Sequence, residues 1–133
     1  MKTIQSIDFI PPATAELHIL RIVGGVSYRP TLPLDLGSLP ADARAVIAAA
    51  VTFLASHLPE GYAPNRIPMT RLPGAIPEDD PASPASDDIL GSVLGNHPEY
   101  GPLAIPQGQI ILPSEIRVPL LQVWAAVEAT LNP

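Results

Sequence analysis

The sequence predicts an α+β fold, in which a small antiparallel sheet built around a β-hairpin packs against two α-helices and carries a long proline-rich extended strap. Three observations predict this fold. Two β-rich runs flank a Gly-Gly pair, and two stretches repeat their apolar residues at helical spacing. In addition, 18 of the 133 residues are proline. No proline falls within 41–58 or 120–132, as expected of helices, because proline disrupts a helix interior. A chain of this length predicts a single domain over residues 1–133.

The N-terminal segment, residues 1–12, is expected to be an extended arm or an edge strand. Residues 3–10 alternate loosely between apolar and polar side chains and stop at Pro11-Pro12. Because proline is confined to strand ends and sheet edges, we place this first strand at an edge.

Residues 15–36 contain the clearest local signal, a hairpin centred on Gly24-Gly25. A two-residue turn of this kind needs positive φ, and it pairs Val23 with Val26, Arg21 with Tyr28 and Ile19 with Pro30. One face then carries Leu17, Ile19, Arg21, Val23, Val26, Tyr28 and Leu32, and the other Glu16, His18, Leu20, Ile22, Ser27, Arg29 and Thr31. The first face should pack on the helices. The second face includes two large aliphatic side chains, Leu20 and Ile22. Either the rest of the chain or a partner must cover them.

The two helices are expected over residues 40–57 and 119–132. The first begins with Pro40, has Asp42 at the positive end of the helix dipole, and ends before Pro59. We expect Pro119 to begin the second helix after a separate turn, since a proline disfavours one continuous helix from residue 114. Ile47, Leu54 and Trp124 lie on the apolar stripes of these helices and should be buried.

Residues 59–86 have seven prolines and are expected to form the strap. We expect no regular secondary structure here, only docking of the apolar side chains that lie between the prolines, on the chain's own body or on a neighbour. Further on, 88–94 is predicted as a short helix with a strand as the alternative, because Gly91 weakens a helix. Residues 96–108 are expected to be loop and 109–112 a short strand.

Composition excludes several classes of partner. The net charge is −6 and the seven basic residues are scattered, so no phosphate-tracking surface is predicted. With two Phe, three Tyr and one Trp, the chain also lacks a base-stacking platform. We expect no nucleic-acid or membrane partner, because no apolar run is long enough to span a bilayer and the N-terminus does not resemble a signal peptide. The predicted location is the cytoplasm or a virion.

Candidate catalytic and metal-binding residues give only weak signals. The chain has no cysteine, and His18, His57 and His97 show no metal-ligand spacing and no neighbouring carboxylate. The acidic residues 78–80 and 87–88 lack the pattern of a calcium loop and are interpreted as a solvated segment and a helix cap. Glu16 has no evident acidic partner, and no phosphate-binding loop is present. We therefore predict no catalytic residue, no cofactor and no metal site.

The sequence therefore favours a non-enzymatic structural or assembly subunit of a homo-oligomeric complex, with further protein subunits as the other possible partners. A virion component, such as a capsid decoration, neck or tail protein, is its most concrete form. The expected interface residues are His18, Leu20, Ile22, Tyr62, Ile67, Met69 and Leu72. One alternative is a small-molecule or peptide-binding module with a pocket under the strap, walled by Trp124 and by Tyr62 or Tyr100. The other is a hydrolase-like enzyme built around His57 or His97.

Overall fold

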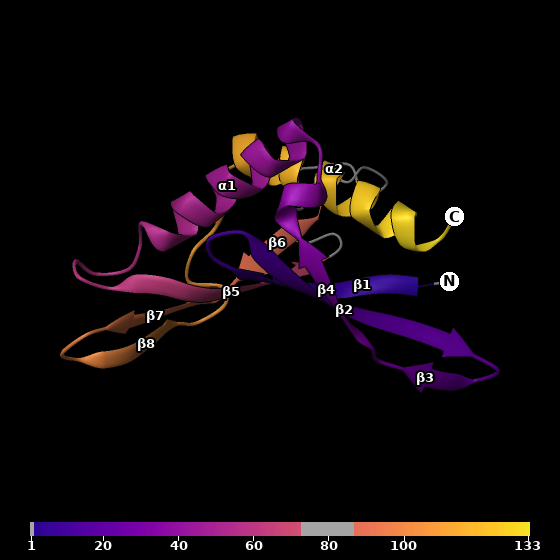
Figure 1. Ribbon diagram of the computed structural model, residues 1–133, viewed down its shortest axis with the longest axis horizontal. Helices are drawn as coiled ribbons and strands as arrows, with labels where there is room; N and C mark the ends of the chain where they lie inside the picture. The colour runs from indigo at the N-terminus through magenta and orange to yellow at the C-terminus, as the bar shows by residue number, and fades with distance from the viewer. Residues whose placement is uncertain (1, 73–86) are drawn as a thin grey trace.

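The fold is α+β, with an antiparallel sheet covered on one face by two helices. The computed structural model describes residues 2–72 and 87–133. Eight strands form the sheet, and α1 and α2 lie together on one side of it (Figure 1). This confirms the predicted class, an antiparallel hairpin and sheet packed against two helices. The part of the predicted strap at 73–86, with the acidic residues 78–80, lies outside the described residues.

The order of the strands in the sheet differs from their order in the sequence. The strands are β1 (Lys2–Ile10), β2 (Thr14–Val23), β3 (Val26–Tyr28), β4 (Thr31–Asp35), β5 (Ala63–Leu72), β6 (Asp88–Gly91), β7 (Val93–His97) and β8 (Gly101–Ile105). The helices are α1 (Ala41–Ala55) and α2 (Ser114–Leu131), with a short 3-10 turn at Leu36–Ser38. The order is β3-β2-β1-β5-β7-β8, with β4 also paired to β2 and β6 to β5.

The predicted hairpin register is confirmed. Gly24 and Gly25 have φ of 58° and 78°, values that L side chains rarely adopt. Val23 pairs with Val26 and Arg21 with Tyr28. The same offset continues into β4, where the predicted Ile19–Pro30 pairing is made by a backbone hydrogen bond of 3.0 Å from the Ile19 N–H to the Pro30 carbonyl. β2 therefore pairs with β3 and with β4 in the same register.

β1 lies inside the sheet, so the predicted edge position is wrong. Its register with β2 runs from Lys2 opposite Arg21 to Ile10 opposite Thr14, and its other side pairs with β5 over residues 6–9. The prolines that follow residue 10 end the strand but do not force it to the edge, because both are outside the paired residues.

The strap prediction is wrong for residues 63–72, which form the interior strand β5. Pro68 is tolerated there because of the direction in which its backbone faces. Its carbonyl accepts a hydrogen bond from Ser92 N–H at 2.9 Å. Since the N–H and C=O of one strand residue point to the same side, the donor that Pro68 lacks would face Ser92, between β6 and β7, and β1 loses no ladder bond.

Residues 88–97 form β6 and β7, so the short helix predicted at 88–94 is wrong and its strand alternative is right. The glycines explain this outcome. A Cβ on Gly91 would lie 3.3 Å from Leu54 Cδ1, and one on Gly95 would lie 2.9 Å from Leu58 Cδ1. Leu54 of α1 and Leu58, which follows α1, therefore pack so closely on these strands that an added Cβ would crowd them.

Three further boundaries differ from the sequence prediction. The loop expected at 96–108 contains β8, which forms a hairpin with β7. Residues 109–112 form no strand; their alternating apolar side chains Ile110 and Leu112 are instead buried in the core. α2 begins at residue 114 and includes Pro119. Pro119 has no N–H to donate to the Glu115 carbonyl, so this carbonyl lacks its helical hydrogen bond. Glu115 is exposed, so water can solvate the carbonyl instead.

The core lies between the sheet and the helices. Ile47, Leu54 and Trp124 are 4%, 1% and 2% exposed, which confirms that they are buried. Neither helix of the described part of the chain has the length and apolar character needed to cross a bilayer.

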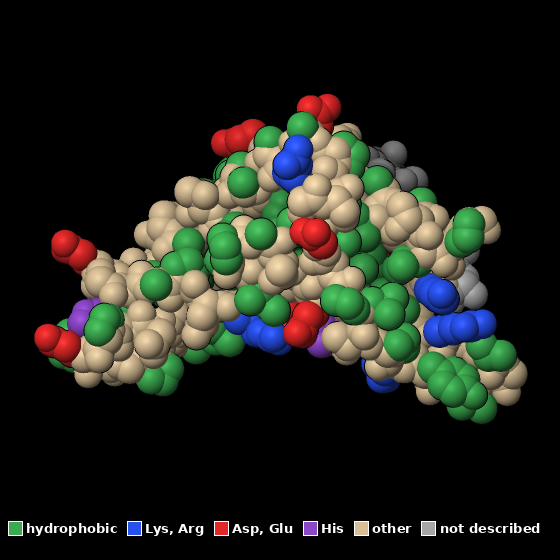
Figure 2. All heavy atoms as spheres, viewed as in Figure 1, with side chains coloured by type: hydrophobic (Ala, Val, Ile, Leu, Met, Phe, Trp, Pro, Cys, Tyr) green, Lys and Arg blue, Asp and Glu red, His purple; other side chains and the backbone are tan. Residues whose placement is uncertain are grey.

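The molecule has the outline of an arch. In Figures 1 and 2 the helices lie at the top, and the other face of the curled sheet forms the hollowed underside. The β2–β3 hairpin forms one end of the arch and the β7–β8 hairpin forms the other.

Candidate functional site

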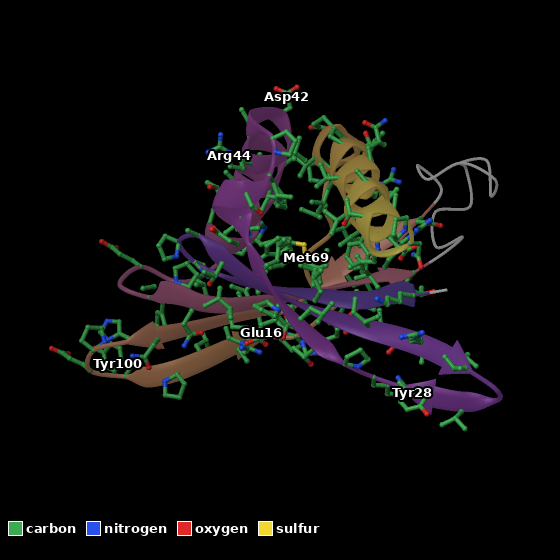
Figure 3. All side chains as sticks on the ribbon, turned by 45° about the vertical axis from the view of Figure 1, so that its right-hand side comes forward. Glu16, Tyr28, Asp42, Arg44, Met69 and Tyr100 are labelled. Atoms are coloured by element: carbon green, nitrogen blue, oxygen red, sulfur yellow. The ribbon has the colours of Figure 1, made fainter. Side chains whose placement is uncertain are left out.

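A cluster of charged side chains lies on the sheet face opposite the helices. Its members are Asp8 on β1, Glu16 and His18 on β2, and Arg66 on β5. Asp8 lies directly opposite Glu16 in the β1–β2 register, out of phase with the neighbouring residues that face the core. Figure 3 shows Glu16 below the sheet, whereas Met69 lies above it with the helices.

Asp8 is the centre of this cluster. Arg66 Nη1 donates to Asp8 Oδ2 at 2.9 Å, and His18 Nε2 lies 3.1 Å from the same oxygen. Arg66 Nη2 is 3.3 Å from Glu16 Oε2, and Thr31 Oγ1 is 3.5 Å from His18 Nδ1. The Asp8 side chain is 10% exposed, whereas those of Arg66 and His18 are 37% and 38% exposed. Asp8 Oδ2 therefore contacts two protein groups at once, in a side chain that is mostly removed from water.

The cluster resembles a cation site in spacing but functions as an ion-pair network. Asp8, Glu16 and His18 offer ligand atoms within 4.8 Å of one another. However, the guanidinium of Arg66 already contacts both carboxylates, so a cation would have to displace it. The network cross-links β1, β2 and β5 on the uncovered face, and we assign no metal to it.

Sequence reasoning missed this cluster. It expected no carboxylate beside His18 and no acidic partner for Glu16. Both expectations are wrong, because Asp8 lies beside His18 and directly opposite Glu16. One signal was available in the sequence. Pro11-Pro12 indicates a turn, and pairing the strands on either side of it places Asp8 opposite Glu16. Arg66 gave no such signal, because its strand was taken for part of the strap.

Replacing Arg66 with methionine should lower the free energy of unfolding by roughly 1–3 kcal/mol, because the mostly buried Asp8 carboxylate loses its guanidinium partner. Urea denaturation measures the effect. Arg44→Met, on the exposed side of α1, is the matched control and should stay within about 0.5 kcal/mol of the wild type. Adding Asp8→Asn to Arg66→Met should recover part of the loss. An unchanged midpoint for Arg66→Met would contradict the network.

A second ionic cluster contradicts the interpretation of residues 87–88 as a solvated helix cap. Asp87 and Asp88 are 3% and 7% exposed. Arg71 donates to the Asp87 carboxylate, and Arg117 Nη1 donates to the Asp87 carbonyl at 3.1 Å. These contacts connect the end of β5, the start of β6 and α2.

The β2–β3 hairpin leaves the body of the protein with its apolar side chains uncovered. We call residues 21–30 the arm; every one of them is exposed. Its large apolar side chains are Ile22, Val23, Val26 and Tyr28, with exposed fractions of 57%, 49%, 52% and 54%. The expectation that the Val23 face packs on the helices is therefore wrong beyond Ile19, because the hairpin extends past the part of the sheet that the helices cover (Figure 1).

The predicted interface residues lie in different parts of the structure. Ile67 and Met69 are 0% exposed in the core of their own chain, so they cannot form an interface. Tyr62 packs against the ring of His97, with 5.1 Å between centroids, and Leu72 is 39% exposed at the end of β5. Only His18, Leu20 and Ile22 come together, since they project from one face of β2.

The side chains expected to form a pocket, Trp124 with Tyr62 or Tyr100, do not line a common cavity among the described residues. Trp124 lines a core cavity of about 10 Å³, at most the size of one water molecule. Tyr62 and Tyr100 instead flank His97. In the described part of the chain, the hydrogen bonds of His57 and His97 go to backbone atoms.

No protein-family model, curated protein or solved structure matches the chain. We therefore infer its function from the arm and the surfaces described above.

Proposed function

We propose that the chain is a non-enzymatic structural subunit of a homo-oligomeric assembly, and that the arm forms the contact between copies. The observation behind this proposal is the run of ten exposed residues, 21–30, with four large apolar side chains about half exposed. Full burial of one such side chain contributes about 1.5–3 kcal/mol, so a surface that covers the arm gains stability from each of them.

The shape of the arm favours a protein surface over a small ligand. Its two faces are both uncovered, because Val23 and Ile22 project to opposite sides of β2. A two-stranded ribbon that extends from its sheet is only marginally stable in water. A neighbouring subunit that packs against both faces would stabilise the ribbon and remove its apolar side chains from solvent.

A virion component, such as a decoration, neck or tail protein, is the concrete form of this proposal. Such particles repeat one subunit many times, so a single arm contact is used in every copy. The chain would then be found in the cytoplasm of the host cell during assembly and in the finished particle.

A peptide-binding or small-molecule-binding module is the second candidate. A specific feature favours it: a groove of about 650 Å³ between α1 and α2, with Leu39, Val46, Val123 and Val127 in its lining. This volume is in the range of ligand pockets, and the side chains suit an apolar ligand. A monomeric protein in solution would favour this second function.

The mass in solution tests the proposal. Light scattering should find an oligomer for the wild type and a monomer for Ile22→Asp, with the circular dichroism spectrum retained. Ile111→Asp is the matched control, since Ile111 is 65% exposed but lies outside the arm, and it should leave the oligomer intact. A wild-type monomer, or an Ile22→Asp variant that stays assembled, would contradict the arm contact.

A further inference from the structure

The two ends of the arch have opposite charge. The arm has Arg21 and Arg29, both exposed, and contains no acidic residue. Lys2 lies opposite Arg21 in the β1–β2 register and adds a third cation at this end. In Figure 2, Lys and Arg side chains gather beside the arm. In a chain of net charge −6, this concentration of positive charge distinguishes the arm from the rest of the molecule.

The opposite end is acidic. Glu60 precedes β5 and Glu99 lies in the β7–β8 turn, and both are exposed. The two segments are in contact, because a Cβ on Gly61 would lie 2.7 Å from His97 Nε2. Residues 57–65 and 96–108 contain no Lys or Arg. Figure 2 accordingly shows Asp and Glu side chains, but no Lys or Arg, at this end.

The acidic end also has a defined structure and an exposed aromatic side chain. His97 Nδ1 accepts hydrogen bonds from the backbone N–H groups of Glu99 and Tyr100, at 3.0 and 3.2 Å, which fixes the turn. The ring of Tyr100 packs on His97 with centroids 4.4 Å apart, yet the residue is 74% exposed. Figure 3 places Tyr100 and Tyr28 at the two ends of the molecule. Each end thus combines charge with an uncovered aromatic side chain.

We propose that the occupant of the arm is the acidic end of a second copy, so that subunits join head to tail. This inference rests on the proposed function and adds the partner surface to it. Opposite charges attract across such a contact, whereas an arm-to-arm contact would bring four arginines together. A contact between two different surfaces is heterologous, so repeating it produces a closed ring or an open filament. Tyr28 and Tyr100 would provide its apolar part.

Charge reversal tests the pairing of the two ends. One variant reverses the arm (Arg21→Glu, Arg29→Glu), and the other reverses the acidic end (Glu60→Arg, Glu99→Arg). Each alone brings like charges together at every contact, so the protein concentration for half-assembly should rise roughly tenfold or more at low salt. An equimolar mixture of the two should assemble again, because each arm then meets an end of opposite charge. The quadruple variant should assemble alone. Light scattering measures all four samples.

The controls separate folding from assembly. All four side chains are exposed, and circular dichroism with thermal unfolding checks that each variant folds. If a reversal disrupts folding, the neutral pairs Arg21→Gln with Arg29→Gln and Glu60→Gln with Glu99→Gln replace it, with a smaller expected shift. A wild-type monomer would overturn the proposed function itself. A wild-type oligomer whose reversed variants assemble equally well, or whose quadruple variant fails to assemble, would overturn only the head-to-tail pairing.

Discussion

Replacing Trp124 with alanine should lower the free energy of unfolding by about 3–5 kcal/mol, the usual cost of removing a buried aromatic side chain. Trp124 is 2% exposed on α2 and lines, with Ile7 and Phe9 of β1 and Ile47 of α1, a cavity of only about 10 Å³. The side chain therefore joins both helices to the sheet, and alanine would leave a hole that the surrounding strands cannot fill.

Trp124→Phe is the control for this variant. Among the described residues, the buried indole Nε1 has no hydrogen-bond partner. Phenylalanine removes this unpaired donor and keeps most of the apolar volume, so the loss should be clearly smaller than for alanine. Urea denaturation followed by circular dichroism measures both variants, because Trp124 is the chain's one tryptophan and its fluorescence is lost. A loss below about 1 kcal/mol for Trp124→Ala would mean that α2 is misplaced.

Leu54→Ala should cost about 2–5 kcal/mol of unfolding free energy, because Leu54 is 1% exposed and packs against Gly91 of β6. Urea denaturation again provides the measurement. Thr52→Ala, on the exposed side of α1, should change stability by about 0.5 kcal/mol or less.

The contact with Gly91 allows a sharper test of the same packing. In the wild type, a Cβ at position 91 would lie 3.3 Å from Leu54 Cδ1, so Gly91→Ala crowds the interface. In the Leu54→Ala background that neighbour is gone, and Gly91→Ala should cost less than it does alone. The Pro68 carbonyl oxygen, also 3.3 Å from such a Cβ, remains in both backgrounds, so the difference between the two costs reports the Leu54 contact alone. A cost that rises in the Leu54→Ala background would contradict this contact.

The elements that the sequence predicts correctly are those that depend on residues close together in the sequence. The turn at Gly24-Gly25 fixes the register of β2 and β3, since positive φ at two consecutive residues admits few alternatives. The apolar stripe of α1 identifies Ile47 and Leu54 as core residues, since helical periodicity is a local property. Trp124 follows from the same reasoning on α2.

The elements predicted incorrectly depend on partners that are distant in the sequence. β5 contains Pro64 and Pro68, a composition typical of a linker, and becomes a strand because β1, β6 and β7 pair with it. The charged cluster shows the same dependence, since Arg66 and Asp8 are 58 residues apart. No local pattern marks such a pair, and only the strand order brings it together.

β2 runs without interruption from the core to the arm, and this continuity has a geometrical consequence. Its residues 15–19 are held under the helices while its last residues project into solvent, all within one strand of ten residues, roughly 33 Å long. No loop therefore separates the β2 part of the arm from the body. In an assembly joined through the arm, the orientation of each copy relative to the next would follow from the twist of a single strand, so the curvature of the whole particle would be determined within one subunit.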